Sequence, residues 1–404
     1  MNKIVLRIAG LFVMISLFFI FQYQNQAPIS DTAECNSIGN PAFVYCSEIM
    51  GYEYELVSFP DGGQDGVCKM PDGELCAQWD FYAGTCGQAH SWCAKQSGKL
   101  ELRQDGKDPY SKEYAVCLDA QGRNLGPVSS LIGQKVSDLL QPMPFPESDE
   151  IVSDPFSTDE RNKPKSPINF DWRNYLGVNW VTPVKNQASC GSCWAFSAVG
   201  LAEAQQNIIS NDPSVDMDLS EQYLVSDCFQ YGNCTEGIDV YALEYIRDEG
   251  IPDEACYPYI AEDSLCSDRC KNFRSRLVFV PNVHSATNYN QVQYTQDEIK
   301  KYLSNYGPVT VALAISSSII GGYWDGDIYR CSNDIPDGGL PGLNHSVLAV
   351  GYNDVGGYWI IKNSWGSTWN GDGYFKLGYN ECNVMNGQIS WTKSRLPVED
   401  ELPD

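Results

Sequence analysis

The 404-residue sequence contains only three histidines, His90, His284 and His345. A reaction that needs an imidazole base therefore has few candidates in this chain. Positive charge is also scarce, because 27 Lys and Arg residues face 52 Asp and Glu residues and give a net charge of −25. A surface of this sign repels phosphate backbones, so we expect no nucleic-acid partner.

Long apolar runs are almost absent, which excludes a polytopic membrane protein. The single run covers residues 8–21 and follows Lys3 and Arg7, a pattern typical of a secretory signal. Counted from Ile4, the run is also long enough for an uncleaved anchor, with Arg7 at its edge. We expect residues 1–27 to be a signal peptide or a single-pass membrane tether. Either alternative places the protein outside the cytoplasm, secreted or anchored.

Cysteine, in contrast, is abundant. Sixteen cysteines spread over the chain indicate disulfides in an oxidising compartment. Seven of them lie within residues 35–122, among turn sequences such as Pro60-Asp61-Gly62-Gly63. We predict a small cysteine-rich accessory domain over 35–122. Because seven is odd, at least one of these cysteines lacks a partner inside the domain.

The rest of the chain divides by composition. Residues 123–168 are rich in proline and are predicted to form a linker. Residues 169–392 form a second unit, and 393–404 an acidic tail. The unit's first half has helical patterns at 193–209 and 240–247, and its second half has strand patterns at 309–315, 346–352, 358–362 and 373–377. This order predicts an α+β unit with two lobes and a cleft between them.

Five side chains suggest nucleophilic catalysis. Cys193 lies at the start of a predicted helix, where the helix dipole favours a thiolate. His345 opens an apolar strand, and Asn363, one strand later, supplies an amide to orient its ring. Trp365 supplies an indole that shields this hydrogen bond from water. Gln187, six residues before Cys193, is placed to join the Cys193 backbone N–H in an oxyanion hole.

Taken singly, these residues also have non-catalytic interpretations. Cys190 and Cys193 form a C-x-x-C pair, which in isolation indicates a redox disulfide or half of a zinc site. No second pair with histidine at ligand spacing accompanies them, so we predict no metal. His90 and His284 lack catalytic company and are expected to be structural or exposed.

These residues stand in motifs that resemble those of papain-family cysteine proteases, in family order over about 220 residues. The motifs are Asp171-Trp172-Arg173, Val181-Thr182-Pro183-Val184-Lys185-Asn186-Gln187, Cys190-Gly191-Ser192-Cys193-Trp194-Ala195-Phe196-Ser197, Leu219-Ser220-Glu221-Gln222, Tyr257-Pro258-Tyr259, Asn344-His345 and Asn363-Ser364-Trp365-Gly366. The resemblance implies a papain-like two-lobe fold, a helical lobe plus a β-barrel-like lobe, that hydrolyses peptide bonds without a metal or organic cofactor. It implies Cys193 as nucleophile, His345 as acid and base, Asn363 as the residue that orients the histidine, and Gln187 as oxyanion donor.

The resemblance also implies disulfides and a substrate rim. It suggests the pairs Cys190–Cys234, Cys228–Cys266 and Cys331–Cys382, which leaves Cys256 with Cys270 and Cys193 as the thiol. The substrate-binding residues that it implies are Gly237, Glu236, Ala312, Leu343, Trp365 and Gly387. Gly237 would pair with substrate backbone while the adjacent acid alters the outer subsites. Ala312, Leu343 and Gly387 are small or apolar, so we expect a hydrophobic residue two before the scissile bond.

The segment from Asn40-Pro41-Ala42 to Trp79-Asp80-Phe81-Tyr82 resembles a small domain of unknown function found in bacterial putative haemolysins, which implies no chemistry. The helical inhibitory pro-region usual in papain-like proteases is not visible before Phe170. One hypothesis is therefore that the small domain or the linker occludes the cleft until it is cut. We expect an exported, monomeric endopeptidase that acts on proteins or peptides. An exopeptidase and a non-enzymatic binding protein remain as alternatives.

Overall fold

The structure is a computed structural model that describes residues 39–108, 110–131, 166–287, 294–314, 322–331, 343–385, 387–393 and 396. Within these ranges no helix combines the length and the apolar character needed to span a bilayer. Residues 1–27, predicted as a signal peptide or anchor, lie outside the described residues, as do Cys35 and most of the acidic tail.

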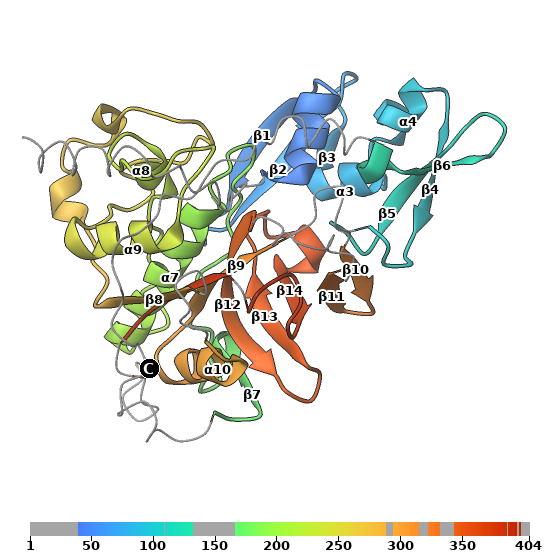
Figure 1. Ribbon diagram of the computed structural model, residues 1–404. Coiled ribbons are helices and arrows are strands. Elements are labelled where there is room, and N and C mark those ends of the chain that lie inside the picture. Colours follow the sequence, from blue (N-terminus) through green and yellow to red (C-terminus); the bar gives the residue numbers. More distant parts are fainter. Residues whose placement is uncertain are drawn as a thin grey trace, which may run out of the picture.

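The N-terminal domain consists of two small antiparallel sheets joined by short helices (Figure 1). Its elements are α2 (Pro41–Phe43), η1 (Val44–Ile49), β1 (Glu53–Ser58), β2 (Gln64–Lys69), β3 (Leu75–Ala77), α3 (Gln78–Ala83), η2 (Gln88–His90), α4 (Trp92–Lys95), β4 (Lys99–Arg103), β5 (Tyr114–Leu118) and β6 (Asn124–Pro127). Three disulfides hold it together, Cys46–Cys68, Cys76–Cys86 and Cys93–Cys117. Strand β6 lies inside the segment 123–168 that was predicted as a linker. It belongs to the domain, because it completes the second sheet against β5.

The helical lobe is built around one long helix. Its elements are β7 (Asn169–Asp171), η3 (Trp172–Asn174), α7 (Cys193–Ser210), α8 (Glu221–Val225), α9 (Asp239–Asp248), η4 (Cys266–Asp268) and η5 (Phe273–Arg276). Helices α7 and α9 agree with the predicted helices within two residues. Helix α7 is buried on nearly every side, because α9 packs on one flank and the β lobe on another. Its burial therefore exceeds the one apolar face that the sequence suggested.

The β lobe is a long sheet in the order β10-β11-β14-β13-β12-β9-β15-β8, with β7 of the other lobe added to β12. Its elements are β8 (Val283–Thr287), α10 (Gln296–Asn305), β9 (Val309–Leu313), β10 (Gly322–Asp325), β11 (Ile328–Cys331), β12 (His345–Asn353), β13 (Tyr358–Lys362), η7 (Trp369–Gly371), β14 (Tyr374–Gly378) and β15 (Gln388–Thr392). The predicted strands correspond to β9, β12, β13 and β14. The α+β organisation with a helical and a β lobe is thus present.

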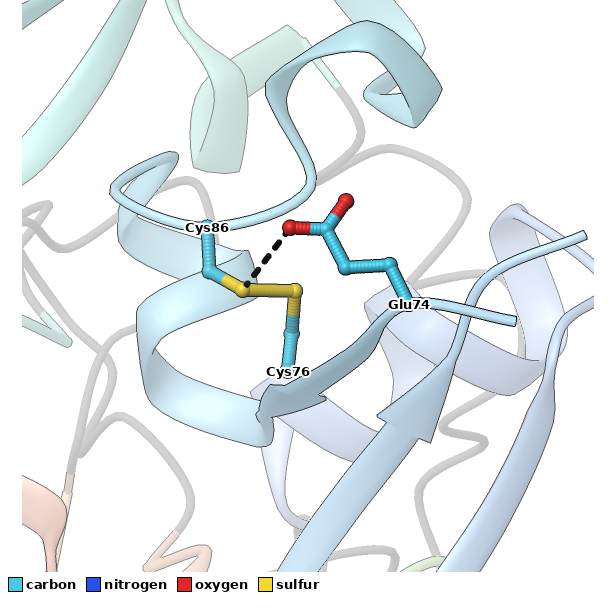
Figure 2. A group of neighbouring side chains, drawn as sticks. All are labelled: Glu74, Cys76 and Cys86. Carbon is cyan, nitrogen blue, oxygen red and sulfur yellow. Dashed lines mark hydrogen bonds between the residues drawn. A yellow bond between two sulfur atoms is a disulfide. The ribbon is translucent and has the colours of Figure 1, made fainter. Parts of the chain in front are cut away.

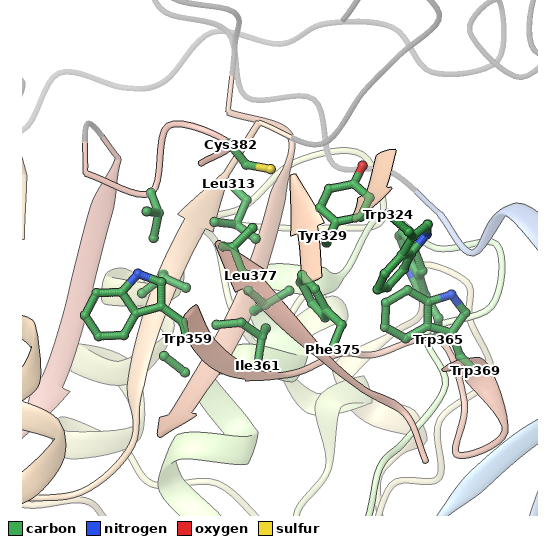
Figure 3. Packing of buried hydrophobic residues seen from close by; sticks show 14 of the residues in the cluster. Leu313, Trp324, Tyr329, Trp359, Ile361, Trp365, Trp369, Phe375, Leu377 and Cys382 are labelled. Carbon is green, nitrogen blue, oxygen red and sulfur yellow. The ribbon is translucent and has the colours of Figure 1, made fainter. Parts of the chain in front are cut away.

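Two hydrophobic clusters form the interior. One fills the helical lobe around α7. The other begins in the N-terminal domain, with Tyr45 and Trp79, and continues through Trp365 and Trp369 into the β lobe. Figure 3 shows part of this cluster, with Trp324, Trp365 and Trp369 close together. The N-terminal domain therefore shares one continuous core with the β lobe.

Candidate active site

The ends of three elements bring the predicted catalytic residues to one place between the lobes. Helix α7 starts at Cys193, strand β12 starts at His345, and Asn363 directly follows β13. Antiparallel pairing of β12 with β13 sets the start of one strand beside the end of the other. The Ser346 backbone N–H donates to the Cys193 sulfur at 3.4 Å, so the thiol lies next to the histidine segment.

The hydrogen bonds around His345 define which ring nitrogen is basic. Its Nε2 lies 2.8 Å from Asn363 Oδ1. The same oxygen accepts from the Ser364 backbone N–H at 2.9 Å, which identifies that atom as the amide oxygen. Nε2 therefore carries a hydrogen and donates it, leaving Nδ1 as the basic nitrogen of the neutral ring. Among the described residues, the buried Nδ1 has no hydrogen-bond partner.

The surroundings of His345 are dry. Its ring is 1% exposed and stacks on the Trp365 indole, with ring centroids 4.9 Å apart. Burial lowers the pKa of His345 to about 4, and the hydrogen bond that the ring donates to Asn363 opposes this only in part. An imidazolium at neutral pH therefore needs an anion beside it, and a Cys193 thiolate is the group placed to supply that charge.

Gln187 is held rigidly next to Cys193. Its backbone N–H donates to Ser364 O at 2.9 Å, and its Oε1 accepts from Ser364 Oγ at 2.6 Å. Its Nε2 donates to Cys190 O at 2.9 Å. An amide nitrogen carries two hydrogens, so this geometry is compatible with an oxyanion donor.

Two supporting residues were not assigned a role by the sequence. Ser364 fixes the Gln187 amide, as described above. The Tyr259 hydroxyl donates to Gln187 O at 2.8 Å and lies 2.7 Å from Ser192 Oγ, next to Cys193. Both belong to recognised motifs, which was the available signal, but the motifs do not reveal which atoms their hydroxyls contact.

On the predicted substrate rim, Gly237 lies against Trp194. A Cβ atom at this position would be 2.1 Å from the indole Cε2, so the backbone can approach the ring only because glycine has no side chain. Glu236 is partly exposed beside it, and its carbonyl accepts from the Asn233 N–H at 2.8 Å.

The three residues predicted for the second subsite meet in space. An added Cβ on Gly387 would be 3.3 Å from both the Ala312 Cβ and the Leu343 Cδ1. Ala312 belongs to β9, while Leu343 and Gly387 precede β12 and β15. Distant parts of the chain thus form one small apolar group.

The disulfides of the second unit are those that the sequence implied. The structure pairs Cys190 with Cys234, Cys228 with Cys266, Cys256 with Cys270, and Cys331 with Cys382. Cys193 takes part in none of the disulfides of the described residues. The bridge at Cys190 tethers the segment before α7 to the Gly237 rim.

In the N-terminal domain, Cys76 and Cys86 lie beside a carboxylate in an arrangement that resembles a metal site. Glu74, Cys76 and Cys86 lie within ligand distance of one another. Figure 2 shows that the two sulfurs are bonded to each other beside the Glu74 carboxylate. A disulfide offers no thiolate, so these residues do not form a thiolate metal centre.

With this geometry established, comparison with known proteins identifies the family. The model of the papain family cysteine proteases matches residues 166–392, more than half of the chain, and the chain belongs to this family. The domain of unknown function (DUF333) matches residues 37–85.

Several relatives are cathepsin-like. Digestive cysteine proteinase 3 of Homarus americanus is 39% identical over 220 residues, which are 53% of this chain and 62% of that protein. Cathepsin S of Bos taurus is 36% identical over 335 residues, 78% of this chain and 92% of that protein. The chain covers less than two thirds of the first of these relatives. Among solved structures, procathepsin L2 from the larval midgut of Tenebrio molitor is 31% identical, with a TM-score of 0.44 over 56% of this chain and 68% of that one.

Proposed function

We propose that this chain is an exported, monomeric cysteine endopeptidase in which Cys193 is the nucleophile and His345 the acid and base. The observation that carries the proposal is the His345 ring, whose Nε2 is held by Asn363 while the amide after it binds the Cys193 sulfur. Export is supported by the seven disulfides of the described residues, because disulfides form and persist in oxidising compartments.

In the proposed reaction, the Cys193 thiolate attacks the peptide carbonyl carbon. The Cys193 backbone N–H and Gln187 Nε2 stabilise the oxyanion that forms. His345 Nδ1 then gives its proton to the leaving amine, and a thioester to Cys193 remains. Water, deprotonated by the same nitrogen, releases the acid product and restores the thiol. Asn363 keeps the ring in the required tautomer throughout.

Substrate selection is proposed to reside on the rim. Gly237 pairs with the substrate backbone, with Glu236 facing the outer subsites. Trp365 is 1% exposed and stacks on the histidine that protonates the amine, so its part is to hold that ring. The apolar group of Ala312, Leu343 and Gly387 favours a hydrophobic residue two before the scissile bond. A peptide library that selects Arg or Asp there contradicts this preference.

Among the described residues, the side chains that hydrogen-bond to or stack on His345, namely Asn363 and Trp365, are uncharged. An exopeptidase needs a charge near the scissile bond to bind a substrate terminus, so this environment favours internal cleavage. A fluorogenic peptide blocked at both ends distinguishes the two, because only an endopeptidase hydrolyses it.

Thiol alkylation tests the catalytic assignment and the non-enzymatic alternative together. We expect iodoacetamide at pH 7 to label Cys193 rapidly, and labelling and peptide hydrolysis to be lost in Cys193→Ala. Cys35→Ser is the control, since Cys35 is the one cysteine of the accessory region outside the three disulfides of the described residues, and this variant should keep full activity. Slow labelling of Cys193 with no hydrolysis in the wild-type chain would show a binding protein built on a protease fold.

A further inference from the structure

The N-terminal domain hydrogen-bonds to the main chain of Trp365, the tryptophan of the active site. The Trp365 carbonyl oxygen accepts hydrogen bonds from Trp79 Nε1 at 2.8 Å, Gln78 Nε2 at 3.1 Å and Asn40 Nδ2 at 3.3 Å. The donors belong to the domain of unknown function, and all three side chains are buried. The Trp365 ring stacks on His345, and Trp365 follows Asn363 by two residues. Anchoring this carbonyl therefore anchors the segment that holds the catalytic histidine.

The same domain also holds the segment that carries Gln187. Asn40 Nδ2 donates to Asn186 Oδ1 at 2.9 Å, and Asn186 Nδ2 donates to the Tyr54 hydroxyl at 2.9 Å. The Asn40 backbone N–H donates to Ala188 O at 2.8 Å, and Gln64 Oε1 accepts from the Asn186 N–H at 3.2 Å. The residues on both sides of the oxyanion donor are thus fixed from outside the peptidase unit.

The approach between the two units is too close for an incidental contact. Gly366 has a φ of +95°, and a Cβ there would lie 2.8 Å from Gln78 Nε2 and 2.9 Å from Asp65 Oδ1. Trp79 packs beside Trp365 with ring centroids 6.1 Å apart, within the hydrophobic cluster that continues into the β lobe. In Figure 1 the sheet of β1–β3 lies above the junction of the two lobes, whereas the sheet of β4–β6 lies on the side of β10 and β11 of the β lobe.

From this arrangement we propose that the N-terminal domain is a permanent third lobe that positions the two catalytic segments, with Asn40, Gln78 and Trp79 as positioning residues. The proposal rests on the proposed peptidase function. Asn40 is the key residue, because one amide group joins the Asn186 side chain to the Trp365 carbonyl. The domain then supports catalysis and does not act as a detachable inhibitor, which is the opposite of the occlusion hypothesis drawn from its place in the chain.

The sharpest test is Asn40→Asp in the full chain. The change keeps the side-chain oxygen that accepts from the Ala42 N–H, but it turns the donor into a second carboxylate oxygen facing three oxygen atoms. We expect kcat to fall at least tenfold while KM changes less than twofold, because the catalytic segments are displaced and the rim is not. Asn124→Asp makes the same change at an exposed residue of the domain, whose side-chain oxygen accepts from the Gly126 N–H, and should behave as wild type.

A second variant tests the proposal in case Asn40→Asp does not fold. Trp79→Phe removes the indole N–H and retains an aromatic ring, with Trp92→Phe as its control. We expect a threefold or greater fall in kcat, and a shift of the pH midpoint of Cys193 alkylation to higher pH, because a less firmly held imidazolium stabilises the thiolate less. Loss of packing alone would not move that midpoint in the folded protein.

Unchanged or increased kcat in both variants, with the wild-type chain hydrolysing peptide through Cys193, overturns the positioning role and leaves the proposed function intact; an increase identifies an inhibitory domain. Absence of Cys193-dependent hydrolysis in the wild type overturns the proposed function, and the positioning role with it.

Discussion

At the scale of single residues, the charge on His345 depends on the sulfur beside it. Burial lowers the pKa of the ring to about 4. We predict that in Cys193→Ala the ring is neutral at pH 6, since no thiolate compensates for burial, whereas in the wild type the thiolate keeps it protonated at higher pH. Histidine NMR titration measures both, and only three histidines need assignment.

The sign of the stability effect follows from the same shift. In Cys193→Ala, the lowered pKa of His345 stabilises the fold fully above the unfolded pKa of about 6.5, and this contribution is lost as the pH falls towards 4. His345→Gln serves to assign the resonance. An unshifted midpoint near 6.5 in the alanine variant would show that the ring is hydrated and that the site is more open than described.

Gly237 offers a second test of a single residue. A methyl group at this position meets the Trp194 ring at 2.1 Å, so we predict that Gly237→Ala costs about 1–3 kcal/mol of unfolding free energy. It should also lower kcat/KM by displacing the substrate rim. Gly200→Ala is the matched control, because its added carbon would meet Leu348 Cδ2 at an ordinary 3.4 Å and glycine is unfavourable within a helix. Urea unfolding and peptide hydrolysis measure both effects. Equal stability of the two variants would contradict the steric account of Gly237.

At the scale of elements, the sequence predicted the parts of the site that lie at the ends of strongly patterned segments. Cys193 begins α7, and His345 begins the apolar strand β12, so periodicity and motif order agreed. Strands β8 and β15 were missed because their polarity follows tertiary packing, and helix α10 was missed although a capping box of Thr295 and Glu298 marks its start. Contacts such as Tyr259 with Gln187 depend on loop geometry, which a single sequence does not reveal.

A buried ion cluster joins the Gln187 segment to two helices. Lys185 Nζ lies 2.9 Å from Glu203 of α7 and 3.1 Å from Glu221 of α8, and these three side chains are nearly inaccessible. We predict that Lys185→Met costs about 3–5 kcal/mol, because it leaves carboxylates buried without their cation. Urea unfolding measures the cost. Lys69→Met breaks the exposed pair with Glu53 and should cost under about 1 kcal/mol. Similar costs for the two would show that the cluster is hydrated.

At the scale of the whole molecule, the position of the N-terminal domain against the peptidase unit could not be predicted from the sequence. The resemblance of residues 40–82 carried no chemistry, and nothing local marks Asn40 as a partner of Trp365, 325 positions away. The interface exists because buried amides and an indole satisfy one carbonyl across two units. Such complementarity is a property of two folded surfaces, and it becomes visible only when both are placed.

Mild acidification from pH 7 to 5 should stabilise the folded protein. Burial raises the pKa of Asp108, in the N-terminal domain, and of Asp239, on α9, each to about 6. A carboxyl with a raised pKa favours the folded state fully below its unfolded pKa of about 4, and this advantage is lost as the pH rises through 6. A shift of about 2 units corresponds to at most about 3 kcal/mol for each group.

We therefore predict that the melting temperature rises as the pH is lowered from 7 to 5, aided by relief of the net charge of −25. Thermal unfolding across pH 4–8 measures this profile. Asp108→Asn combined with Asp239→Asn should raise the melting temperature at pH 7 and flatten the profile, because amides are neutral at every pH. A melting temperature that falls steadily from pH 7 to 5 in the wild type would show that these carboxyls are ionised and solvated in the folded protein.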